Sequence, residues 1–119
     1  MALHHRSERG ANEEAMRINP YHPERFWNHL GRAQFVARAY TDAIQSFSRI
    51  TKPDHTHFAF LAAASAQLGD AGAASGFARE AISRAPDFTV RAYLATLHYR
   101  NESDLAHHRE ALLKAGLPG

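Results

Sequence analysis

The apolar residues of this chain recur every three or four positions, and proline and glycine interrupt the pattern at regular intervals. A spacing of three to four residues gathers apolar side chains on one face of a helix. β-Branched residues are scattered, and no long stretch alternates between apolar and polar positions, so strands are not expected. The pattern predicts an all-α protein. Its interruptions are INPYHP (18–23), TKPD (51–54), LGDAG (68–72), APDF (85–88) and AGLPG (115–119).

The helices are expected to form antiparallel pairs. The first pair begins at Pro23, a residue type favoured in the first turn of a helix, and its first helix runs to about Arg38. Thr41 is the predicted N-cap of the second helix, which runs to Ile50 before the proline of TKPD. Apolar residues at helical spacing in both segments predict a hairpin whose helices face each other.

Two further pairs follow by the same reasoning. In the second pair the first helix ends at Leu68, where Gly69 can take the left-handed conformation that closes many helices. Asp70 is the predicted N-cap of the next helix, and Pro86 stops that helix. The third pair is expected to use Asp87 and Ser103 as N-caps, to turn within RNESD (100–104) and to end at Gly116 and Pro118.

Residues in these helix pairs match the sequence pattern of a known repeat. The tetratricopeptide repeat (TPR) has a period of about 34 residues and the pattern W-x2-L-G-x2-Y, then A-x3-F, then P. Trp27, Leu30 and Gly31 match its opening. Gln34 stands where an aromatic residue is expected. The other matches are Tyr40, Ala43, Phe47 and Pro53 in the first copy, Phe58, Leu61, Ala62, Gly69, Ala74, Ala81 and Pro86 in the second, and Ala92, Tyr99, Leu105, Leu112 and Ala115 in the degenerate third.

The resemblance implies a TPR-like right-handed superhelix of antiparallel helix pairs over residues 23–119, with repeats at about 23–53, 54–86 and 87–119. Residues 1–22 are expected to form a flexible segment and a half-repeat helix, because Ala15 and Pro20 stand where a preceding second helix would end.

A second resemblance covers most of the chain. The stretches NPYHPERFWNHLGRAQFVARAYTDAIQSFSRI, FLAAASAQLGDAGAA and PDFTVRAYLATLHYRNESDLAHHREALLKAGLP resemble the C-terminal TPR region of bacterial class III adenylate/guanylate cyclases of the rhizobial type. In that family a cyclase catalytic domain lies upstream, and the repeats form a regulatory or partner-binding tail. A chain of 119 residues has no room for that domain, so no nucleotide chemistry is implied.

In TPR modules the first helix of each repeat lines a concave groove, and the resemblance projects this groove onto the present chain. A peptide with apolar side chains and a carboxylate suits such a groove. Ala59 and Ala63 stand where a chaperone-tail clamp needs polar groups, so that ligand is not expected; Thr56 and Val90 share the projected face. The expected partner-binding residues are Arg25, Asn28, His29, Arg32, Phe35, Phe60, Gln67, Tyr93, Leu94, Leu97 and Arg100. For Arg25 and Arg32 a solvated helix surface is the alternative.

Composition narrows the function classes. Hydrophobic residues make up 45% of the chain and charged residues 22%, as in one ordinary globular domain. A net charge of +2 without interleaved aromatic and basic residues does not favour a nucleic-acid partner. The lack of cysteine excludes disulfides and thiolate metal sites. No apolar stretch reaches the length of a membrane span, so we expect no membrane partner and a cytoplasmic protein.

Candidate chemistry is sparse. Among nine histidines, the strongest metal candidate is DHTH, with Asp54, His55 and His57, but no recognised ligand motif completes a site there. No serine has a nucleophile-elbow context, and no motif pairs two carboxylates. We therefore expect a non-catalytic protein without a cofactor.

Two functions remain. The first is a protein-interaction module whose groove binds a peptide or a partner domain, such as the cyclase catalytic domain of a longer relative. The second is a structural self-association module, a homodimer that buries Leu105, Leu112 and the N-terminal helix at the end faces of the solenoid.

Overall fold

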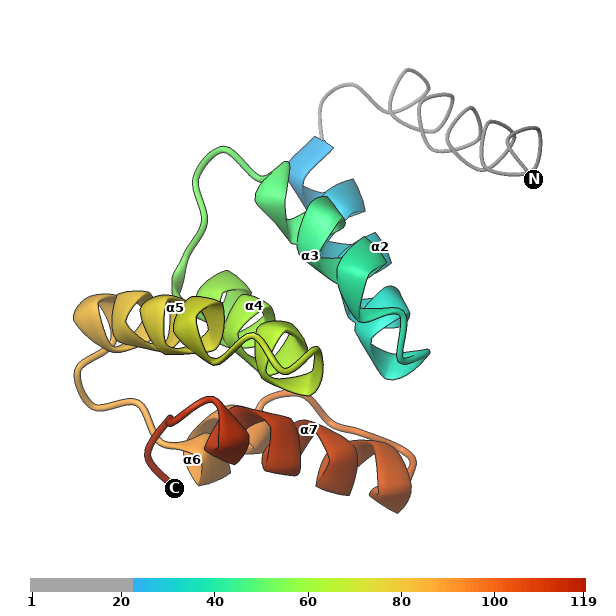
Figure 1. Cartoon of the computed structure of the whole chain (residues 1–119). Helices are drawn as coiled ribbons and strands as arrows, with labels where there is room; N and C mark the ends of the chain where they lie inside the picture. The colour runs from blue at the N-terminus through green and yellow to red at the C-terminus, as the bar shows by residue number, and fades with distance from the viewer. Residues whose placement is uncertain (1–22) are drawn as a thin grey trace.

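The computed structural model describes residues 23–119, which form helices joined by turns (Figure 1). No strand occurs within this range, as the all-α prediction requires. The half-repeat helix expected within residues 1–22 lies outside the described residues. The described helices are α2 (Pro23–Val36), α3 (Tyr40–Ser48), α4 (His55–Gln67), α5 (Ala71–Arg84), α6 (Val90–Ala95) and α7 (Glu102–Lys114).

A glycine allows the first two helices, α2 and α3, to approach closely. A Cβ atom added to Gly31 on α2 would lie 2.7 Å from the ring of Phe47 on α3. Trp27, on the same helix as Gly31, is buried. Gln34, which stands where the repeat pattern has an aromatic residue, accepts a hydrogen bond of 2.6 Å from the Ser46 hydroxyl on α3. This polar residue therefore links the two helices. Gly31 and Phe47, which both match the repeat pattern, therefore lie where α2 and α3 pack together.

Several helix ends lie where the sequence predicts them. Gly69 ends α4 with a φ of +81°, and Gly116 ends α7 with a φ of +97°, both in the left-handed region that glycine adopts readily. Asp70 caps α5, because its carboxylate accepts a hydrogen bond of 3.1 Å from the backbone N–H of Ala73. At these positions the residue type alone was sufficient to predict where the helix ends or begins.

Three predicted N-caps are wrong. Helix α3 begins one residue earlier than expected and has no side-chain cap, so Thr41 lies inside its first turn. Thr89 rather than Asp87 caps α6, and Asn101 rather than Ser103 caps α7. In both corrected cases the capping residue has extended backbone angles immediately before the helix, which directs its side-chain oxygen toward the first amides.

Helix α4 lies at the centre of the fold. It packs against α3, α5 and α7 and also contacts α2. All residues from Ala59 to Ala66 are buried, and most of them are alanines. Small side chains on every side of a helix allow several neighbours to approach it, so the core gathers around α4.

The third pair does not close as a regular hairpin. Helix α7 packs against α4 far more extensively than against its sequence neighbour α6 (Figure 1). The buried face of α7 consists of His108, Ala111 and Leu112, and the C-cap Ala115 continues this stripe. Because α6 has six residues and α7 has 13, α6 spans about 9 Å against about 20 Å for α7, and it covers only part of that helix.

Candidate functional site

The aromatic residues of the predicted groove do come together. Phe35 on α2 and Phe60 on α4 have ring centroids 5.5 Å apart, and Tyr93 on α6 lies 6.4 Å from Phe60. All three are buried, with exposed fractions of 5% or less. The projection from the repeat pattern therefore places these residues on one face.

That face is covered by α7, which corrects the expectation of an open groove at these residues. The His108 ring lies 4.8 Å from Phe35 and 4.7 Å from Phe60 between ring centroids, and it meets the Tyr93 ring edge-on. Leu94, another predicted groove residue, is only 5% exposed. The alanines of α4 let α7 lie close to it, and His108 and Leu112 of α7 pack there and help to bury the aromatic rings.

Among the remaining predicted groove residues, Arg32 contacts the aromatic cluster. Arg32 is half-buried, and its guanidinium lies 5.6 Å from the centroid of the Phe60 ring, a cation–π contact. Arg25, His29 and Arg100 are exposed, whereas Asn28, Gln67 and Leu97 are half-buried.

Two neighbouring histidines of α7 are held in the cluster by tyrosines. The Tyr99 hydroxyl lies 2.9 Å from His108 Nδ1, and the Tyr40 hydroxyl lies 2.6 Å from His107 Nε2. Burial, reinforced by the nearby positive charges, lowers the pKa of His108 to about 3, and burial is also the main cause that lowers the pKa of His107. Both rings are therefore neutral at neutral pH and serve as packing groups.

Unpaired polar atoms mark the same cluster. Within the described part of the chain, the buried side-chain atoms without a hydrogen-bond partner are Tyr93 Oη, His107 Nδ1 and His108 Nε2. Burial raises the pKa of Tyr93, so its hydroxyl stays protonated. Each unpaired atom destabilises the contact between α7 and the aromatic face, because its hydration is lost without replacement.

The DHTH stretch has a structural role at the start of α4. The Asp54 carboxylate accepts a hydrogen bond of 3.3 Å from the His57 amide, and the Asp54 amide donates one of 3.0 Å to His57 Nδ1. This reciprocal arrangement is a capping box. Across residues 23–119, no group of three or more His, Cys, Asp or Glu side chains is placed to hold a metal ion.

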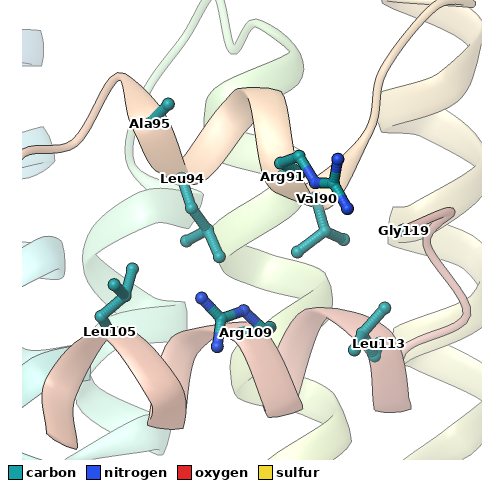
Figure 2. A pocket seen from close by; sticks show the side chains of 8 residues that line it. All are labelled: Val90, Arg91, Leu94, Ala95, Leu105, Arg109, Leu113 and Gly119. Carbon is teal, nitrogen blue, oxygen red and sulfur yellow. The ribbon is translucent and has the colours of Figure 1, made fainter. Parts of the chain in front are cut away.

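An open groove lies between α6 and α7 (Figure 2). Its volume is about 440 Å³, within the usual range of about 300–1,000 Å³ for ligand pockets. Figure 2 shows Leu94 pointing from α6 toward α7, and Leu105 and Leu113 pointing from α7 toward α6. We call this feature the α6–α7 groove; its lining residues are Val90, Arg91, Leu94, Ala95, Leu105, Arg109, Leu113 and Gly119.

The helical spacing of its residues builds the groove. On α7, Leu105, Arg109 and Leu113 stand four residues apart and form a stripe beside the one buried against α4. The C-terminal residues close one end: the Pro118 carbonyl accepts a hydrogen bond of 2.7 Å from the Val90 amide. The groove is thus the space that the short α6 leaves beside α7.

Two arginines border the apolar floor. Arg91 and Arg109 are exposed, and neither forms an ion pair with another residue of the described range. Arg38, by contrast, pairs with Asp104 at 3.0 Å. Leu113, on the same wall as Arg109, is 46% exposed. The groove therefore presents apolar surface beside two positive charges without a described counterion.

Sequence reasoning found only part of this groove. Leu94 was an expected partner-binding residue, and Leu105 was expected at a dimer contact. Arg91, Arg109 and Leu113 were missed, although the four-residue spacing along α7 is visible in the sequence. The expected role of Leu112 in self-association is wrong, because this side chain is fully buried within the chain.

None of the helices within residues 23–119 is long and apolar enough to cross a membrane. The chain matches no protein-family model, no curated protein and no solved structure.

Proposed function

We propose that the chain is a non-catalytic protein-interaction module and that its partner docks in the α6–α7 groove. The observation that carries the proposal is a groove between two helices in which Leu113 is exposed and Leu105 half-buried, bordered by arginines that lack ion-pair partners in the described range. Grooves between helices are a recurrent docking site for peptide segments of partner proteins. The covered aromatic face is not part of this proposed site.

The framework of the proposal is TPR-like. The close approach of Gly31 to Phe47 supports assigning the first pair to such a repeat, and the central position of α4 suits a stacked solenoid. The proposal includes a right-handed superhelix, in which the third pair is modified by the placement of α7.

We also propose that the chain is related to the TPR tails of class III nucleotide cyclases, on the strength of the sequence stretches quoted above. In a protein of that kind the module would bind a catalytic domain of the same chain or a regulatory partner. The coding sequence tests this relation directly: an in-frame cyclase domain upstream is expected, and an unrelated upstream reading frame would refute it.

The binding proposal is tested by selecting peptides from a phage-displayed random library on the whole chain. Ala95→Trp is the blocking variant, because Ala95 is exposed and lines the groove, so that an indole there occupies the space without entering the core. Ala92→Trp is the matched control, since Ala92 is exposed on the same helix but does not line the groove.

We expect selected peptides to bind the wild type and Ala92→Trp equally and to bind Ala95→Trp about tenfold more weakly or worse, because the central pocket of an interface dominates binding. Far-ultraviolet circular dichroism verifies that both variants keep the helical fold. A selection that enriches no peptide, or peptides that bind Ala95→Trp unchanged, would refute docking in this groove.

A further inference from the structure

The charges and the backbone of the α6–α7 groove restrict the chemistry of its occupant. The apolar lining is buried at Val90 and Leu94 and accessible at Leu105 and Leu113, and this accessible part favours apolar side chains in a ligand. Arg91 on α6 and Arg109 on α7 stand on the two walls of the groove, so a ligand there meets positive charge from both helices (Figure 2). Carboxylates are the groups that an arginine at an interface pairs with most favourably.

The backbone of the groove offers no edge for an added strand. Both walls are helices, whose main-chain groups are paired along the helix. The first two amides of α6 are also taken, because Val90 donates to the Pro118 carbonyl and Arg91 donates to a main-chain oxygen of Gly119 at 3.4 Å. A partner must therefore bind through side chains, as an amphipathic helix does when its apolar face enters a groove.

We infer that the α6–α7 groove binds an acidic amphipathic helix of a partner protein, with apolar residues on the leucine floor and Asp or Glu side chains against Arg91 and Arg109. This inference rests on the proposed function and adds the chemical class of the partner. The partner's leucine-like residues recur at three or four positions, and its acidic residues flank that stripe on both sides, because the arginines stand on opposite walls.

A second copy of this chain fits the groove less well. A twofold contact through this face would place Arg91 and Arg109 of one copy close to the same arginines of the other, and like charges brought together at an interface oppose association. The net charge of +2 adds to that repulsion. An acidic partner instead neutralises the arginines and associates faster as ionic strength falls.

The selected peptides provide the test. Each is synthesised with its Asp and Glu residues intact and again with all of them changed to Asn and Gln. Both forms are titrated against the wild type, Arg91→Gln, Arg109→Gln and the double variant. Arg79→Gln is the control, because Arg79 is an exposed arginine on α5 outside the groove.

We expect the acidic form to become helical on binding, as measured by circular dichroism. Each arginine substitution in the groove should weaken its binding about fivefold, in the range of a partly exposed charge pair. Arg79→Gln should leave affinity unchanged, and the Asn/Gln form should bind the wild type about as weakly as the acidic form binds the double variant.

The outcomes separate this inference from the proposed function. If no peptide is enriched, or if Ala95→Trp binds as well as the wild type, the proposed function itself fails. If selected peptides are blocked by Ala95→Trp but carry no excess of acidic residues and ignore the arginine substitutions, docking stands and the acidic helix is refuted. A dimer of the chain alone in light scattering that Ala95→Trp abolishes would assign the groove to a second copy and overturn the inference.

Discussion

Acidification should destabilise this protein at pH values above those at which its carboxylates titrate, because His108 is buried as a neutral ring. The His108 side chain is 0% exposed, and it contacts Phe35 and Phe60. No acidic residue is among the groups that shift its pKa; burial, His107 and Arg32 all lower the pKa. Protonation of the ring therefore has no compensating partner in the folded state.

The magnitude follows from the two pKa values of His108. The pKa is about 3 in the folded chain and 6.5 for an unperturbed histidine, so the unfolded state binds the proton more readily. Stability is thus fully present above pH 6.5 and is lost as the pH falls from 6.5 toward 3. Between pH 7 and pH 5 the free energy of unfolding should drop by about 2 kcal/mol.

Urea denaturation at pH 7, 6 and 5, followed by circular dichroism at 222 nm, measures this loss. His108→Gln is the decisive variant: its amide oxygen can still accept from the Tyr99 hydroxyl, but it does not titrate. The variant should be less stable at pH 7 and lose most of the pH dependence. His107→Gln should also reduce the pH dependence, because the pKa of His107 is lowered in the same direction.

Wild-type stability that stays constant from pH 7 to pH 5 would refute the reasoning, and so would a His108→Gln variant that keeps the whole slope. In either case His108 would not be buried and neutral, and α7 would not cover the aromatic face as described. The pH range chosen lies above the ordinary pKa of Asp and Glu, which separates the histidine effect from general acid unfolding.

Two further predictions use matched pairs of substitutions measured by urea denaturation. Gly31→Ala should destabilise the fold by about 1–3 kcal/mol, because the new methyl group meets the Phe47 ring, whereas Gly76→Ala, with open space around the added carbon, should stabilise α5 by up to about 1 kcal/mol. Equal effects of the two substitutions would contradict the close approach of α2 and α3. Asp54→Ala should cost about 1 kcal/mol through loss of the capping box, and Asp87→Ala should be nearly neutral because Asp87 caps no helix; the reverse order would show that the cap assignments are wrong.

Helix ends show where sequence reasoning succeeds and where it stops. Gly69 and Asp70 were located because a left-handed glycine and a capping carboxylate depend on their immediate neighbours alone. Thr41, Asp87 and Ser103 were plausible caps by residue type, but each lies two residues from the N-cap position of its helix. Packing moves a helix boundary by that amount without changing the local pattern.

In the candidate site, too, some features followed from the sequence and others depended on long-range packing. The projection placed Phe35, Phe60 and Tyr93 on one face, because each lies on the side of a first helix that was expected to line the groove. Whether that face is open depends on α7, about fifty residues away from Phe60 in the chain. The groove appeared elsewhere because α6 is too short to cover the Leu105 stripe of α7.

By itself the sequence determined the helical class, the turns and the close contact of Gly31 with its neighbouring helix, because periodicity, caps and a missing Cβ act over one or two turns. Only the tertiary structure decided which face of α7 is buried. Its two neighbouring stripes both contain leucine, and the alanine-rich surface of α4 selected the one with His108. That choice covered the aromatic face and left Arg109 beside an open apolar groove, since long-range packing favours the closest fit over the pairing of sequence neighbours.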